Sequence, residues 1–306
     1  MRRLPLTALS ALLGGLALLL AGCGGSRAAS SASAGKLQVV AAENFWGSIA
    51  SQLGGSKVAV NSIIVNPNTD PHSYEATASD GVLVARSRMA LVNGLGYDGW
   101  ASKLLAANPS SARVVLDVGN LLGLKEGDNP HQWYSPSSVQ RVTNQIVADY
   151  KRLDPKDAAY FDRQRATFAS RDLAEYNRLR GEIRSRFAGV PVGYSESIFQ
   201  PLGHDLGLKL TTPYSFAKAI SEGTDVSAAD KQTVDTQAED HAIEVWVYNS
   251  QNATPDVQRV NQLARAAHVP ITTITESLSP ASANFEQWQS AQLRSLLQEL
   301  HQATGR

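Results

Sequence analysis

The sequence has only one cysteine, Cys23, in 306 residues. A single thiol excludes an intrachain disulfide and a zinc site built on several thiolates. An excess of charge of one sign is also lacking, because 28 Lys and Arg balance 28 Asp and Glu. The electrostatic footprint of a nucleic-acid-binding protein is therefore missing, and we expect no nucleic-acid partner. A small ligand fits this composition better than a polyanion does.

The N-terminus has the pattern of an export signal. A basic pair and an apolar run over residues 12–20 precede the small-residue segment Leu20-Ala21-Gly22-Cys23. That segment resembles the lipobox of bacterial lipoproteins, which implies cleavage before Cys23 and acylation of its thiol. The apolar run is too short and too rich in glycine for a transmembrane helix. We predict a signal peptide over residues 1–22, a flexible tether over residues 23–36, and an extracytoplasmic protein anchored by lipid to the bacterial cell membrane.

The rest of the chain alternates between short apolar strands and helices, a pattern typical of parallel sheets flanked by helices. The alternation predicts one α/β lobe over residues 37–153 and another over residues 189–306. Between them, residues 154–188 carry apolar residues mostly three, four or seven apart. This spacing predicts one long rigid helix. The expected fold is two α/β lobes joined by that helix, with a ligand site in the cleft between them.

Two short motifs, Asp70-Pro71-His72 and Asn129-Pro130-His131, each place an imidazole in a loop after a predicted strand. Ligands of open parallel sheets bind beyond the carboxyl ends of the strands. Glu196 and Glu276 follow predicted strands of the second lobe in the same way. Two neutral imidazoles and two carboxylates match a divalent cation without net charge at the site. We therefore predict one metal ion held by His72, His131, Glu196 and Glu276.

Each of these residues also has an ordinary structural explanation. Histidine beside proline is common in surface turns, and glutamate after a strand often begins a helix, where the dipole favours it. His204 is a reserve ligand, because it lies about two helical turns beyond Glu196. Gly94-Leu95-Gly96-Tyr97-Asp98-Gly99 matches the glycine pattern of dinucleotide-binding loops, but Asp98 would place a carboxylate beside the pyrophosphate. We interpret these glycines as a tight turn.

The motifs resemble those of the cluster A-I solute-binding proteins, the metal-binding components of zinc and manganese ABC importers. The likeness covers nearly the whole mature chain and includes Asn93-Gly94-Leu95-Gly96 and Asn129-Pro130-His131-Gln132-Trp133. The resemblance implies a bilobed fold with a rigid interdomain helix and one buried Zn(II) or Mn(II) ion as cargo. It also implies a membrane permease with its ATPase as partner. We expect a monomer.

The resemblance also carries over to single positions. His72 and His131 match the two histidines of the first lobe, and Glu196 matches the third ligand, which is glutamate in manganese binders and histidine in many zinc binders. Glu276 stands where most members have aspartate. The histidine-rich acidic stretch of many zinc binders is missing between residues 118 and 131. Oxygen ligands favour Mn(II), whereas most nitrogen and oxygen sites bind Zn(II) more tightly, so both metals stay open.

Two other functions fit the same residues. A metal-dependent hydrolase would use the same His and Glu side chains, but a catalytic metal needs an open position for water. A bilobed receptor for an organic chelate or haem would need an aromatic cleft, for which Trp46, Trp100 and Trp133 are placed. Four protein ligands favour binding over catalysis. We therefore expect a metal carrier and not an enzyme.

Overall fold

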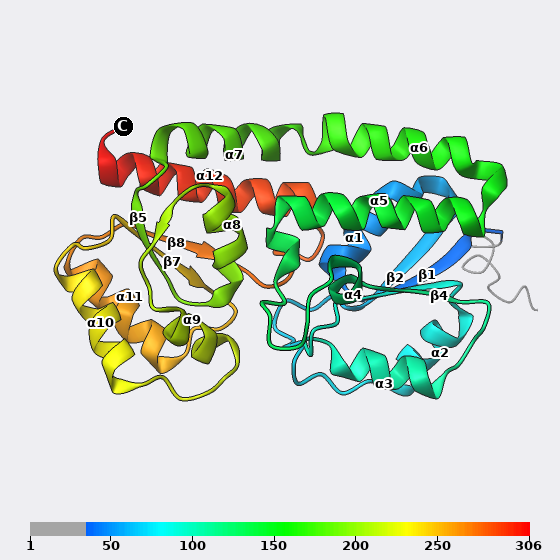
Figure 1. Cartoon of the computed structure of the whole chain (residues 1–306), viewed down its shortest axis with the longest axis horizontal. Coiled ribbons are helices and arrows are strands. Elements are labelled where there is room, and N and C mark those ends of the chain that lie inside the picture. The colour runs from blue at the N-terminus through cyan, green and yellow to red at the C-terminus, as the bar shows by residue number, and fades with distance from the viewer. Residues whose placement is uncertain (1–34) are drawn as a thin grey trace, which may run out of the picture. The chain divides into compact units, whose positions relative to one another are not determined.

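The computed structural model describes residues 35–306 (Figure 1). The predicted signal peptide, Cys23 and nearly all of the predicted tether lie outside the described residues. Residues 36–306 form a single unit that contains two sheets. Among the described residues, no helix combines the length and the apolar character needed to cross a membrane.

Each sheet has four strands, and every pairing between them is parallel. The first sheet has the order β2-β1-β3-β4 and the second has the order β6-β5-β7-β8. The predicted fold class of two α/β lobes is thus confirmed. The strands are β1 (Leu37–Glu43), β2 (Val58–Ile64), β3 (Met89–Val92), β4 (Val114–Asp117), β5 (Pro191–Tyr194), β6 (Lys209–Leu210), β7 (Val245–Asn249) and β8 (Ile271–Ile274).

Helices connect the strands, and their ends follow local signals in the sequence. The hydroxyl of Ser135 caps α5, which begins with Pro136, where a missing N–H costs nothing. Thr77 and Asp80 form a reciprocal capping box at the start of α2. Outside the segment that links the lobes, the helices are α1 (Asn44–Gly54), α2 (Ala78–Arg86), α3 (Gly99–Ala107), α4 (Val118–Leu122), α5 (Pro136–Leu153), α8 (Gln200–Asp205), α9 (Tyr214–Ser221), α10 (Ala228–Glu239), α11 (Pro255–Ala266) and α12 (Phe285–Thr304).

The linking segment is helical, but the prediction of one continuous α-helix over residues 154–188 is wrong. A 3₁₀ turn leads into α6 (Ala158–Thr167), a π-helical stretch follows at Phe168–Asp172, and α7 (Ala174–Phe187) completes the segment. The buried residues Phe161 and Phe168 are seven positions apart, whereas the next buried aromatic residue, Tyr176, comes eight positions later. The wider π turn takes up the extra residue, so all three side chains face the core.

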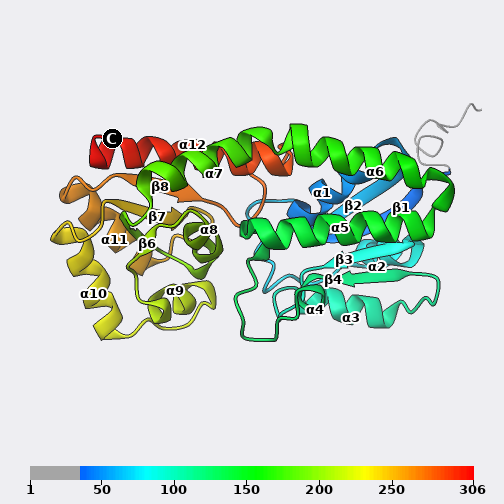
Figure 2. The same ribbon diagram turned by 45° about the horizontal axis from the view of Figure 1, so that its top comes forward.

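The linking segment runs along both lobes (Figures 1 and 2). In both views α6 lies beside α5 in the first lobe, and α7 lies beside α12 in the second. One apolar core includes side chains of both sheets and of these four helices. The two lobes therefore share a continuous packed backing, and the carboxyl ends of their strands are left to form the site.

We expect Phe161→Ala, a substitution in α6, to lower the free energy of unfolding by about 3–5 kcal/mol, because it opens a cavity in the shared core. Phe161 is fully buried. The exposed neighbour Arg163 supplies the control, since among the described residues its guanidinium makes only a cation–π contact with the ring of Tyr160 and Arg163→Ala should change stability by no more than about 1 kcal/mol. Urea unfolding of the metal-free protein measures both values. Equal effects of the two substitutions would contradict this packing.

Candidate metal centre

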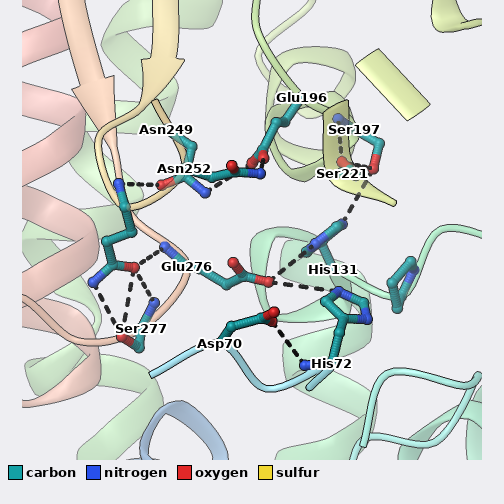
Figure 3. Close-up of polar contacts among 12 residues, drawn as sticks. Asp70, His72, His131, Glu196, Ser197, Ser221, Asn249, Asn252, Glu276 and Ser277 are labelled. Atoms are coloured by element: carbon teal, nitrogen blue, oxygen red, sulfur yellow. Dashed lines mark hydrogen bonds and ion pairs between the residues drawn. The ribbon is translucent and has the colours of Figure 1, made fainter. Parts of the chain in front are cut away.

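His72 lies in the loop between β2 and α2, and its side chain is 36% exposed. Asp70 folds this loop, because its carboxylate accepts a hydrogen bond from the backbone N–H of His72 at 2.9 Å (Figure 3). It also accepts a hydrogen bond from the hydroxyl of Ser73 at 2.8 Å. The imidazole packs edge-on against the ring of Tyr97, with centroids 4.7 Å apart. The loop and this ring together orient an otherwise accessible histidine.

His131 is the buried counterpart of His72 and is only 2% exposed. Its Nδ1 lies 2.8 Å from Oδ1 of Asn129, which also accepts the backbone N–H of His131 at 3.0 Å. Donation from Nδ1 to this amide oxygen leaves the lone pair of Nε2 free for a cation. Burial lowers the pKa of His131 more than the nearby Glu276 raises it, so the neutral imidazole is favoured.

Glu276 follows β8 and brings a carboxylate from the second lobe to both histidines of the first. Its Oε1 lies 3.6 Å from Nε2 of His131 and 3.9 Å from Nε2 of His72. Burial raises the pKa of Glu276, but the close contact with His131 and the charge interactions with both histidines hold the net pKa below its usual value. The three side chains each offer a ligand atom within 4.8 Å of the others. Nitrogen and oxygen donors in this arrangement suit a divalent transition metal.

Glu196, the fourth predicted ligand, follows β5 and lies outside this group of three (Figure 3). Its carboxylate is buried and accepts hydrogen bonds from the side-chain amides of Asn249, at 2.7 Å, and Asn252. Burial, with a smaller contribution from the charge of Glu276, raises the pKa of Glu196 to about 8. The structure thus brings three of the four predicted residues together. The fourth, Glu196, is hydrogen-bonded to two side-chain amides instead.

Two other features of the sequence take ordinary structural roles. His204 is exposed near the end of α8 and does not belong to the group of three. Asp98 accepts the backbone N–H groups of Asn93 and Gly94, at 2.7 and 2.8 Å, and so folds its own loop. Gly94 and Gly96 have φ of 73° and 79°, which the expected tight turn requires.

A cleft of about 560 Å³ leads to this group and has walls from both lobes. His72, His131 and Glu276 line it, together with Tyr214 and Lys218 of α9. The group therefore lines a cleft that both lobes share. The amide side chains of the loop after β7 carry no charge, so the sequence pattern does not single them out. Ligands of open parallel sheets bind beyond the carboxyl ends of the strands, and this strand-end rule points to Asn249 as directly as it points to Glu196.

Comparison with known proteins gives one family and a set of distant relatives. The family model described as zinc-uptake complex component A periplasmic matches residues 39–299. A manganese-binding lipoprotein of Halalkalibacterium halodurans is 30% identical over 201 residues, which are 63% of this chain and 65% of that protein. An iron-binding protein of Yersinia pestis is 28% identical over 185 residues, which are 57% of this chain and 58% of that protein. The matches thus span less than two thirds of these relatives.

Solved structures of similar fold are more distant in sequence. The manganese-bound form of a periplasmic metal binding protein from candidatus Liberibacter asiaticus, a single-site mutant, superposes with a TM-score of 0.73. It is 19% identical, and the superposition covers 86% of this chain and 98% of that chain. At this identity the likeness establishes the fold alone.

Buried Glu196 predicts a pH dependence of stability in metal-free protein. Its pKa is about 8 in the folded state against an ordinary 4.5, so folding favours the neutral acid. The stability that Glu196 contributes is complete below pH 4.5 and is lost as pH rises to about 8. In the Glu196→Gln variant the side chain at this position is uncharged at every pH. We expect the free energy of unfolding of the wild type to fall relative to this variant across that window, in urea titrations with chelator. Parallel pH profiles would contradict the assignment.

Proposed function

The chain belongs to the zinc-uptake complex component A family, and from this membership we propose that it captures Zn(II) or Mn(II) between its lobes and delivers the ion to an ABC importer. The observation that supports this most is the meeting of Glu276 from one lobe with His72 and His131 from the other. The names of the relatives, a manganese-binding lipoprotein and an iron-binding protein, support a transition metal as cargo.

We propose that His72, His131 and Glu276 form the part of the site that exists before metal arrives. Glu196 joins them as the fourth ligand when the ion binds. Two neutral imidazoles and two ionised carboxylates then balance the charge of a divalent ion, which limits the cost of burying it. This donor set accepts Zn(II) in a tetrahedral site and Mn(II) with added oxygen ligands.

We further propose a carrier without catalytic turnover, working as a monomer on the extracytoplasmic side of the membrane. The partner is an ABC permease with its ATPase, which receives the ion. Acylation of the Cys23 thiol, with removal of residues 1–22, provides the membrane anchor, and residues 23–36 form a flexible tether between the anchor and the lobes. The names of the relatives, which include lipoproteins, support this arrangement.

Metal binding should raise the melting temperature of the chelator-stripped protein, because the ion binds the folded state alone. At free metal about 100 times Kd the gain in stability is about 2.7 kcal/mol. We expect Glu276→Ala and His131→Ala to abolish most of the shift. His204→Ala is the control and should keep the full shift, since that exposed histidine lies outside the group.

Thermal melts with Zn(II) and with Mn(II) measure these shifts. A wild-type protein whose melting temperature responds to neither ion would refute the proposed function. An unchanged shift in Glu276→Ala would remove that residue from the ligand set.

The anchor has a separate test. We expect the wild type to incorporate a labelled fatty acid and Cys23→Ser to incorporate none, because the thiol that is acylated is gone. Metal binding by the purified variant should stay unchanged. Labelled fatty acid in the Cys23→Ser protein, or none in the wild type, would contradict a lipid anchor at this residue.

A further inference from the structure

The loop that follows β7 contacts both acidic residues of the metal centre. We call residues Asn249, Ser250, Gln251 and Asn252 the amide loop, because three of its four side chains are carboxamides. The loop starts at the carboxyl end of β7, between the ends of β5 and β8 in the second sheet. Glu196 follows β5 and Glu276 follows β8, so the loop lies between the two carboxylates.

On one side, the amide loop holds the side chain of Glu196. The amide of Asn249 donates to Oε2 at 2.7 Å, and the amide of Asn252 donates to Oε1. Asn249 is itself fixed, because it is fully buried and its backbone N–H donates to the hydroxyl of Ser195 at 3.0 Å. Asn252 also donates to the carbonyl of Ile220 at 3.2 Å. Both oxygens of Glu196 thus have a placed donor.

On the other side, the amide loop holds the backbone of Glu276. The side-chain oxygen of Gln251 accepts the N–H of Glu276 at 2.7 Å and that of Ser277 at 3.0 Å. The backbone N–H of Gln251 donates to the side-chain oxygen of Asn249 at 2.9 Å. A single hydrogen-bonded chain therefore runs from Glu196 through Asn249 and Gln251 to Glu276.

We propose that the amide loop positions both carboxylates for the metal, with Asn249 and Asn252 as positioning residues for Glu196 and Gln251 for Glu276. The inference rests on the proposed function. A carboxylate has about four lone-pair sites, so two amide donors still leave lone pairs for an ion. The amides orient the ligand without displacing the metal, and partners of this kind typically contribute about 10–100-fold to metal affinity.

Asn252 allows the cleanest test, because it is only half-buried. We expect Asn252→Leu, which keeps the size but removes the donor, to weaken Zn(II) or Mn(II) binding by about 10–100-fold. In a Glu196→Gln background the same substitution should have no further effect, since the ligand that it positions is gone. Gln258→Leu is the matched control, because the exposed amide of Gln258 donates to the carbonyl of Ala253 in the same region. The metal affinity of this variant should equal that of the wild type.

Competition with a chromophoric chelator measures the four affinities of this double-mutant cycle. Additive effects of Asn252→Leu and Glu196→Gln, or wild-type affinity in Asn252→Leu, would overturn the inference and leave the proposed function standing. A wild type that binds neither metal would instead overturn the proposed function. If Asn252→Leu lowers the melting temperature of the metal-free protein, Asn252→Ala provides the same cycle without added apolar volume.

Discussion

The contact between one carboxylate and two imidazoles, made across the two lobes, is the constraint on which the rest of the structure depends. Oε1 of Glu276 lies 3.9 Å from Nε2 of His72 and 3.6 Å from Nε2 of His131. That geometry requires the carboxyl ends of both sheets to face each other. It also requires a backing that holds the lobes in place, which the shared core beneath α5, α6, α7 and α12 provides.

Burial acts differently on the ionisable groups of the site. It favours the neutral imidazole of His131 and raises the pKa of Glu196, whereas the histidines keep Glu276 ionised by lowering its pKa. A metal ion needs all of its ligands deprotonated. In the metal-free state Glu276 and His131 already favour that form, whereas burial favours the protonated form of Glu196. If Glu196 is the fourth ligand, as proposed, binding of metal would be coupled to release of its proton.

Much of the fold was predictable, because strands buried in parallel sheets are short apolar runs and the loops after them carry the polar residues. The linking segment was harder, because seven-residue spacing suggests a continuous helix and the eighth residue before Tyr176 signals the π turn only in retrospect. The strand-end rule located His72, His131 and Glu276, and their role as ligands stays a prediction. The amides on Glu196 were missed, because they carry no charge and lie 53 and 56 residues away along the chain.

The most direct test of the central claim is a crystal structure of the metal-loaded protein with anomalous scattering measured at the absorption edge of the bound ion. We expect one anomalous peak between the lobes, within about 2.0–2.2 Å of Nε2 of His72, Nε2 of His131 and a carboxylate oxygen of Glu276 for Zn(II). A peak at another position, or a loaded protein in which either histidine lies outside bonding distance of the ion, would contradict the account.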